Sequence, residues 1–281
     1  MRLTISHSTT YRYSEPVRYG LQELRLRPSD EGTQSVVSWD VSLVGAEHQL
    51  SFEDHFGNQV ELVALSPGAT ETTVTATGVV ETVDTSAVGA KHVGHTPLWF
   101  YERSTPRTTV GHGVRQFCDL VRRGDDDIAR FHDLSAAIRE SVSYETGGSD
   151  MESTAESAIE AGAGVCQDHA HIFIAAARHL GYGARYVSGY LLIDDVIDQD
   201  ATHAWAEVWV NGLGWLGFDV SNGISPDDRY VRVATGLEYR DAAPISGITS
   251  GAGDQSLEVE LQVHDGSGQQ ETGQQGSVAQ Q

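Results

Sequence analysis

Lysine is almost absent from this chain of 281 residues: Lys91 is the only one, and arginine provides the other basic side chains. Against 18 basic residues stand 40 acidic ones, which gives a formal net charge of −22. Proteins that neutralise phosphates do so with clustered lysine and arginine, and no such cluster occurs here. The composition therefore excludes nucleic acid and an anionic membrane surface as partners. It is compatible with a strongly solvated surface in a salty cytoplasm.

Cysteine is scarce and long apolar runs are missing. Cys118 and Cys166 are too few for a disulfide framework, so we expect two reduced thiols. The N-terminus lacks the apolar stretch of about 7–15 residues that a signal peptide needs. The best apolar candidate, residues 171–177, is far shorter than the roughly 20 residues of a membrane span. We therefore expect a cytoplasmic protein that does not cross a membrane.

Residues 1–88 have the pattern of β-structure. Proline and glycine turns separate alternating stretches rich in Val, Thr and Tyr, which predict strands at residues 3–13, 36–44, 59–65 and 72–83. Glycine followed by asparagine is typical of a hairpin turn, so we interpret residues 55–58 as a turn rather than a binding site. These features predict an N-terminal domain that resembles a β-sandwich.

The pattern changes after residue 88. A connector over residues 89–125 contains one stretch of helical spacing, and further helical spacing follows at residues 126–142 and 157–180. β-type runs then occur at residues 184–193, 203–210, 215–220 and 257–263. We expect an α+β domain over residues 126–264. The Gly-, Gln- and Ser-rich residues 265–281 have little to bury and predict a disordered tail.

Cys166 begins the stretch with the clearest chemical signal. Positions 166, 170, 173, 177 and 180 repeat at the 4-3-4-3 spacing of a buried helical stripe. This spacing places Cys166 in the first turn of a core helix, on its packed side. The free N–H groups and the helix dipole at that end would stabilise a thiolate or the oxyanion of a tetrahedral intermediate. On this helix alone, a nucleophile and an ordinary buried thiol both stay open.

Two further segments bear on this choice. In the first segment, which begins at His203, the residues have the period of two that is typical of a strand, so His203 and Trp205 share one face. Residues 211–214 are a turn signal, and a three-residue turn would bring the chain back with Trp205 opposite Asp219. Asp219 would then be the diagonal neighbour of His203, within side-chain reach, whereas a register shifted by one would place it on the other face. Cys166, His203 and Asp219 would provide a nucleophile, a base and an orienting carboxylate.

Four motifs occur in order along the chain: Gly-Val-Cys-Gln-Asp-His-Ala-His from residue 164, Arg-Tyr-Val-Ser-Gly-Tyr from 185, Thr-His-Ala-Trp-Ala-Glu from 202 and Gly-Trp-Leu-Gly-Phe-Asp from 214. Together they resemble the catalytic blocks of the transglutaminase-like superfamily of papain-fold cysteine enzymes. Residues 11–28 and 54–58 are similar to the β-rich N-terminal region of its prokaryotic branch. The resemblance implies a papain-like core in which the helix bearing the cysteine packs on an antiparallel sheet. It also implies that Cys166 is the nucleophile, His203 the base and Asp219 the orienting group.

The chain departs from that family in two places. Val220-Ser221-Asn222 replaces the Pro-Thr-Asn that commonly follows the aspartate, and Gly236-Leu237-Glu238-Tyr239 replaces a Gly-Arg-Asp-Tyr type of stretch. Because the arginine is missing, we expect no contact with an anionic substrate there. Neither departure touches the three predicted catalytic residues.

Several neighbours of these residues have alternative interpretations. Gln167 either contributes to the oxyanion hole or caps the helix, and Trp205 either forms a wall of the substrate cleft or packs in the core. We expect Glu207 to pair with an arginine and His169 to lie beside the site or to form local hydrogen bonds. Cys118 lies among helical apolar residues and predicts a core position.

Metal binding is not expected. Cys166 and His169 have the spacing of metal ligands, but no second pair of Cys or His residues completes a zinc site. Four further histidines have no cysteine or carboxylate companions at catalytic spacing, and we expect them at the surface: His7, His48, His92 and His95. We therefore predict neither a metal nor a cofactor.

The predicted chemistry is thiol-dependent acyl transfer on an amide or peptide bond. If water is the acceptor, the enzyme is a cysteine protease or amidase; if an amine is the acceptor, it is a cross-linking transglutaminase. The resemblance favours hydrolysis, and no long apolar loop that could exclude water is evident. A catalytically silent peptide-binding module is the other alternative. The expected partner is a peptide or protein substrate, whose identity the sequence does not specify, as it does not specify the oligomeric state.

Overall fold

Two β-sheets form a sandwich from the N-terminal part of the chain. The computed structural model describes residues 1–84, 91–92, 94–121, 126–146, 153–193, 198–199 and 201–266. The N-terminal strands are β1 (Arg2–Tyr13), β2 (Tyr19–Arg27), β3 (Gln34–Val44), β4 (Ala46–Glu53), β5 (Gln59–Leu65) and β6 (Glu71–Thr82). Alternate apolar residues of β6 point inward, and Val74, Ala76 and Val80 are almost completely buried. The predicted sandwich is confirmed, although β2 and β4 were not predicted.

Two C-terminal strands complete this sandwich. β14 (Ile245–Ser250) pairs with β2, and β15 (Gln255–Asp265) pairs with β1 along its whole length. With the short β10 (Asp198–Gln199), the sheets have the strand orders β10-β15-β1-β6-β3 and β14-β2-β5-β4. The expected domain over residues 126–264 therefore needs correction, because the strands at its end pair with the N-terminal sheets. Of the predicted disordered tail, residues 267–281 lie outside the described residues.

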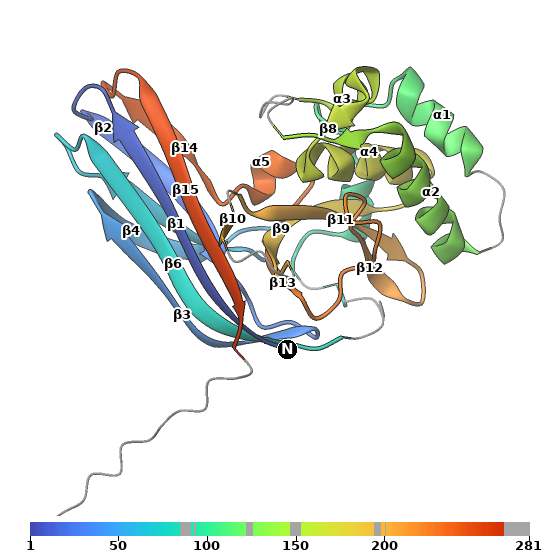
Figure 1. The fold of residues 1–281 in the computed structure, drawn as a ribbon, viewed down its shortest axis with the longest axis horizontal. Helices are drawn as coiled ribbons and strands as arrows, with labels where there is room; N and C mark the ends of the chain where they lie inside the picture. The colour runs from blue at the N-terminus through green and yellow to red at the C-terminus, as the bar shows by residue number, and fades with distance from the viewer. Residues whose placement is uncertain are drawn as a thin grey trace, which may run out of the picture.

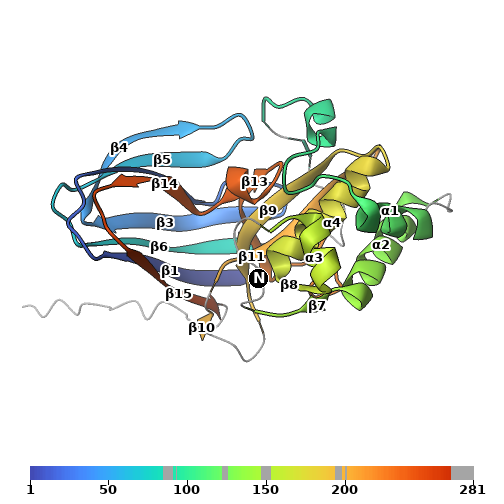
Figure 2. The same ribbon diagram turned by 90° about the horizontal axis from the view of Figure 1, so that it is seen from above.

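The second part of the molecule is an α+β core. Its antiparallel sheet has the order β12-β11-β9-β13, formed by β9 (Ala184–Leu191), β11 (His203–Val210), β12 (Gly214–Phe218) and β13 (Tyr230–Gly236). Its helices are α1 (His112–Leu120), α2 (Asp127–Ser141), α3 (Ala155–Ala161) and α4 (Cys166–His179). Short elements connect them: η1 (Leu98–Glu102), β7 (Ser143–Tyr144), β8 (Ala163–Gly164) and α5 (Tyr239–Ala242). Figures 1 and 2 show this sheet between the helices and the sandwich.

Helix α4 is the centre of this core. It packs on β11 and β9, and every residue from Asp168 to Arg178 is buried. Helix α1 also belongs to the core rather than to a connector, because Val114, Phe117 and Cys118 are buried in the same apolar cluster as α4. The predicted core position of Cys118 is confirmed.

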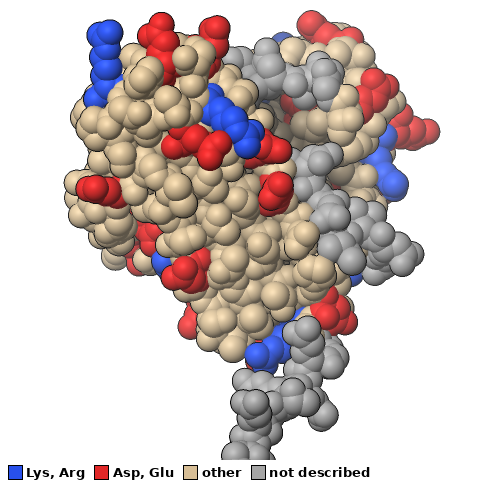
Figure 3. All heavy atoms as spheres, turned by 60° about the vertical axis from the view of Figure 1, so that its left-hand side comes forward, with Lys and Arg blue, Asp and Glu red and all other residues tan. Residues whose placement is uncertain are grey.

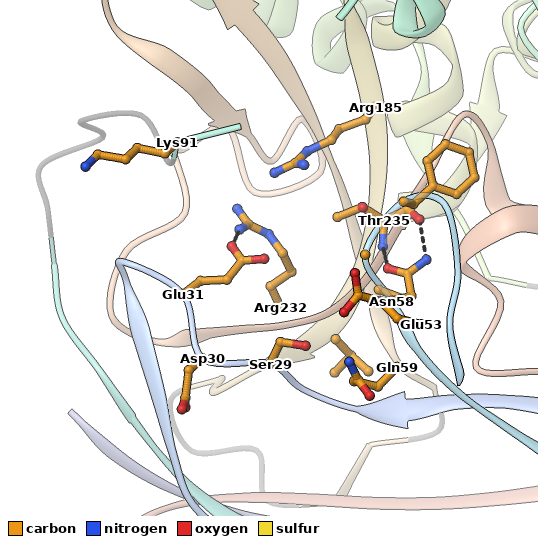
Figure 4. Close-up of a pocket in the computed structure, with 14 residues that line it drawn as sticks. Ser29, Asp30, Glu31, Glu53, Asn58, Gln59, Lys91, Arg185, Arg232 and Thr235 are labelled. Atoms are coloured by element: carbon orange, nitrogen blue, oxygen red, sulfur yellow. Dashed lines mark hydrogen bonds and ion pairs between the residues drawn. The ribbon is translucent and has the colours of Figure 1, made fainter. Parts of the chain in front are cut away.

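The sandwich docks along β13, the edge strand of this sheet. Asn58, in the turn between β4 and β5, exchanges hydrogen bonds with the backbone of Thr235 in β13, and Arg232 of the same strand pairs with Glu31 of the sandwich (Figure 4). These residues line a cavity of about 200 Å³ at the junction. His7 of β1 is buried against Tyr190 of β9, with 3.1 Å between Nδ1 and the phenol oxygen, so the expectation that His7 lies at the surface is wrong.

The surface reflects the acidic composition. On the face in Figure 3, Asp and Glu side chains are spread over the molecule rather than gathered in one patch. Within the described residues, no helix is both long enough and apolar enough to span a membrane.

Candidate active site

Cys166 is the first residue of α4, as predicted. Its side chain is partly buried and packs against the same cluster as Ala170 and Phe173. Asp168 holds the start of the helix, because its Oδ2 accepts a hydrogen bond from the N–H of Val165 at 2.9 Å. Asp168, rather than Gln167, therefore has the capping role. The N–H groups of Cys166 and Gln167 have no acceptor among the described residues, which leaves them free for an oxyanion.

The hairpin of β11 and β12 has the predicted register. Val210 pairs with Gly214 across a three-residue turn, and the ladder continues to Ala206 opposite Phe218. Gly212 in the turn has a φ of 84°, a backbone conformation that glycine adopts without strain. After Phe218 the pairing changes, and Asp219 forms an isolated bridge with Ile224 instead of continuing along β11. The change of partner leaves Asp219 at the end of the strand, beside the first residue of β11.

His203 joins the two other predicted residues. Its Nε2 lies 2.6 Å from Oδ2 of Asp219, and Cys166 lies close enough to act on the pKa of the imidazole. Asp219 is fully buried, whereas His203 and Cys166 are partly buried. The structure thus brings together Cys166, His203 and Asp219, the residues predicted as nucleophile, base and orienting carboxylate.

The environment favours the charged form of His203. Burial alone would lower the pKa of this imidazole, but the hydrogen bonds with Asp219 and Cys166 and the charges of both raise it to about 10. Burial also works against the ionised form of Asp219, yet hydrogen bonds from His203, Asn222 and Tyr230 and the charge of the imidazolium hold the pKa of Asp219 below its usual value. Both groups are thus held in their charged forms, as an imidazolium paired with a carboxylate.

Two residues that the sequence analysis did not assign to the site complete the environment of Asp219. Tyr230 of β13 donates its phenol hydrogen to Oδ2 at 2.7 Å, and the side chain of Asn222 donates to the same oxygen at 2.7 Å. Asn222 lies three residues beyond Asp219 in a motif that was already recognised, so it could have been found. Tyr230 lies in a strand that was not predicted, and no local signal identifies it.

Trp205 is buried, 2 % exposed, with its ring 6.3 Å from that of His203 and 5.4 Å from that of Tyr230. It therefore packs behind His203 rather than in an open cleft. Gln167 is partly buried beside Cys166, and its part in an oxyanion hole stays a prediction. Glu207 pairs with Arg185 and Arg232, which confirms its predicted role as an arginine partner.

The segments that depart from the family pattern are held by other contacts. Ser221 forms a hydrogen bond of 2.8 Å with Nδ1 of His169, whose Nε2 bonds the backbone oxygen of Val142. His169 thus lies beside the site and forms local hydrogen bonds, as expected. Glu238, in the stretch where an arginine is missing, pairs with Arg107 at 2.8 Å.

The described residues contain no group of three or more His, Cys, Asp or Glu side chains that could hold a metal ion. Cys166 and His169, which have ligand-like spacing in the sequence, are engaged separately: Cys166 with His203, and His169 with Ser221 and Val142.

Comparison with known proteins agrees with this geometry. Residues 115–220 match the family described as the transglutaminase-like superfamily, and residues 3–81 match the bacterial transglutaminase-like N-terminal region. An uncharacterized protein of Mycobacterium leprae is 30 % identical over 281 residues, which cover 93 % of this chain and 98 % of the relative. The chain belongs to the transglutaminase-like superfamily. An uncharacterized protein of Mycobacterium tuberculosis is also 30 % identical, over 88 % of this chain and 87 % of its own length.

A solved structure shows the same architecture. The "putative cysteine protease" of Cytophaga hutchinsonii superposes with a TM-score of 0.72 at 20 % sequence identity, and the match covers 94 % of this chain and 91 % of that one. The arrangement of an N-terminal sandwich followed by an α+β core is therefore shared with that protein. At this level of identity the likeness concerns the fold.

Proposed function

We propose that this member of the transglutaminase-like superfamily is a cysteine hydrolase that cleaves an amide or peptide bond. The observation that carries the proposal is the 2.6 Å contact between Nε2 of His203 and Oδ2 of Asp219, with Cys166 close enough to raise the pKa of the same imidazole. Covalent acyl transfer requires a nucleophile, a base and an orienting group that lie close to one another.

The first half-reaction forms an acyl-enzyme. The thiolate of Cys166 attacks the carbonyl carbon of the substrate, and the resulting oxyanion lies near the free N–H groups at the start of α4. The imidazolium of His203 gives its proton to the nitrogen of the leaving amine as the carbon–nitrogen bond breaks. A thioester on Cys166 and a free amine are the products, and Asp219 keeps the imidazole oriented throughout.

The second half-reaction releases the acyl group. Neutral His203 removes a proton from water, which attacks the thioester carbon, and the carbon–sulfur bond breaks as a carboxylic acid is released. The pair of Cys166 thiolate and His203 imidazolium is then restored. If an amine replaced water in this step, the enzyme would be a transglutaminase.

The test is incubation with a defined peptide library, with and without a primary amine, followed by mass spectrometry of the products. Cleavage that adds one water molecule across the amide, and that is lost in Cys166→Ala, is expected. Amine incorporation without hydrolysis would replace the proposal with a transferase. Binding of peptides without turnover, in protein whose thiol is intact, would indicate a silent binding module.

A further inference from the structure

The outer end of the β1–β15 ladder leaves an apolar surface that the catalytic core does not cover. On one face of this ladder, three residues of β1 pair with three of β15: His7 with Leu261, Thr9 with Val259 and Tyr11 with Leu257. At the inner end, Leu261 is 1 % exposed because Val231 and Val233 of the catalytic sheet cover it. At the outer end, Leu257 is 56 % exposed. The catalytic core therefore covers only the inner part of this face.

A cavity of about 260 Å³ lies over the uncovered part. Its other walls come from the segment before β11, from α5 and from the start of β14, and the residues there are Ala201, Thr202, Tyr239, Pro244 and Ile245. The described lining contains no Asp, Glu, Lys or Arg. Burial lowers the pKa of His7, the one titratable imidazole in the lining, to about 4, so this ring is neutral at pH 7. The described lining is therefore uncharged at pH 7, in a protein of net charge −22, and favours apolar groups over charged ones.

Two connections place this cavity next to the catalytic residues. Thr202 in its wall directly precedes His203, so their Cα atoms lie about 3.8 Å apart. Tyr239 in the opposite wall lies with its ring 6.1 Å from that of Tyr186, which is buried in the cluster that Cys166 packs against. The backbone N–H of Tyr239 also donates to Nε2 of His171 in α4, at 3.1 Å. Thr202 thus connects the cavity wall to the start of β11, and Tyr239 connects it to α4.

We propose that this cavity binds one large apolar or aromatic side chain of the peptide substrate, close to the amide bond that Cys166 attacks. The proposal rests on the proposed function and names the substrate class. Pockets that hold whole small molecules measure roughly 300–1,000 Å³, so this smaller cavity suits a single side chain. Tyr11 and Tyr239 offer ring faces and edges to an aromatic group. A charged side chain would lose its hydration there without gaining an ionic partner.

Peptidyl chloromethyl ketones test this proposal, because such reagents bind like a substrate and then alkylate the thiol. In a panel of tripeptide reagents, each position carries Phe, Leu, Gly, Glu or Lys in turn, and kinact/KI is measured from the mass of the protein. At one position, Phe and Leu are expected to react at least tenfold faster than Gly and Glu. Leu257→Arg, a change at the exposed rim, is expected to remove this preference.

The matched control is Ile248→Arg. Ile248 is 67 % exposed on β14 and is not part of the cavity lining, so the same change of side chain there should leave the preference intact. Chloroacetamide, which has no peptide side chain, should alkylate Cys166 at the same rate, within about twofold, in all three proteins. This equality would show that neither arginine disturbs the triad.

The possible results separate the cavity from the proposed hydrolysis. Equal values of kinact/KI for all side chains, or a preference that survives Leu257→Arg, would overturn the proposed cavity. Hydrolysis of the corresponding peptides is measured in parallel. If alkylation shows the side-chain preference but no peptide is hydrolysed, the proposed cavity is supported and the proposed hydrolase activity is refuted. If peptides are hydrolysed without any side-chain preference, the hydrolase activity is supported and the cavity is refuted.

Discussion

Asn58 and Thr235 exchange two hydrogen bonds of 2.8 Å: the side chain of Asn58 donates to the backbone oxygen of Thr235 and accepts from its N–H. The pair joins the sandwich to an edge strand of the catalytic sheet (Figure 4). Asp54 fixes the amide of Asn58 by accepting from its Nδ2 at 2.9 Å. The turn at residues 55–58 is a hairpin turn, as predicted, and it is also the docking element between the two parts of the molecule.

Asn58→Ala tests this docking role. The change leaves the buried N–H and carbonyl of Thr235 without their partner, and each unsatisfied group costs about 1–3 kcal/mol. We expect the free energy of unfolding, measured with urea, to fall by about 2–4 kcal/mol. The control is Asn211→Ala, because Asn211 accepts one hydrogen bond from Trp209 at an exposed turn. Its free energy of unfolding should change by about 0.5 kcal/mol or less. Equal losses in the two variants would contradict the docking role.

Asp219→Asn tests the orienting carboxylate. The variant keeps the shape of the side chain but removes the charge that stabilises the imidazolium of His203. Turnover should fall steeply; the corresponding change in serine triads costs about 10⁴-fold, and a thiolate–imidazolium pair should make the loss smaller here. Because Asp219 is fully buried and accepts hydrogen bonds from three side chains, the free energy of unfolding should also fall by about 1–3 kcal/mol. Asp40→Asn, at an exposed position, should change neither quantity.

Retained turnover in Asp219→Asn would mean that another carboxylate orients His203. Glu207 is not available for this role, because Arg185 and Arg232 both pair with it. The experiment therefore bears directly on the identity of the third catalytic residue.

Tyr230→Phe tests positioning of Asp219 by a residue outside the three catalytic ones. Loss of the 2.7 Å hydrogen bond to Oδ2 should lower kcat several-fold and shift the alkaline limb of the pH–rate profile, because the pKa of His203 depends on the charge and orientation of Asp219. The matched control is Tyr190→Phe, which removes another buried phenol on the same sheet, one that bonds His7. The control should lower stability without moving the pH profile. A shift of equal size in both variants would show that Tyr230 has only a structural role.

The buried His7 predicts an acid-sensitive stability. Its pKa in the folded chain, about 4, lies below the ordinary value of 6.5, so the unfolded chain binds a proton first as the pH falls. The stabilisation is fully present above pH 6.5 and is lost as the pH falls toward 4, where the loss reaches about 3 kcal/mol. The variant His7→Gln can still form hydrogen bonds with Tyr190 and Thr9. Between pH 7 and pH 4, its free energy of unfolding should fall by about 3 kcal/mol less than that of the wild type. The exposed variant His48→Gln should follow the wild type, and parallel curves for all three proteins would contradict the prediction.

The hairpin of β11 and β12 and the helix that begins at Cys166 could be predicted from the sequence for a definite physical reason. A three-residue turn at residues 211–213 and strict alternation determine which side chains face one another, and together they predict Asp219 near His203. The 4-3-4-3 spacing likewise identified the buried side of the helix that begins at Cys166. Both patterns are local, and both depend on backbone periods that tertiary contacts did not override.

Features that depend on non-local pairing could not be predicted in this way. β14 and β15 return to the N-terminal sheets after more than 150 residues of intervening chain, and nothing in their own alternation names β2 and β1 as partners. β4 is exposed along most of its length, so it has no apolar alternation to detect. The burial of His7 against Tyr190 also depends on a contact between distant parts of the chain. The hydrogen bond from Tyr230 was missed because β13, the strand that carries it, was not predicted.

The most direct test of the central claim is to trap the acyl group on Cys166. The protein is mixed with the p-nitrophenyl ester of a blocked amino acid and quenched in acid, and the modified residue is mapped by mass spectrometry. We expect a thioester on Cys166 that disappears with time in neutral buffer, that forms far more slowly in His203→Gln, and that is absent in Cys166→Ala, while Cys118 stays unmodified because it is buried. A thioester on Cys118, equal acylation of Cys166 in His203→Gln, or an acyl group that water never removes would contradict the account.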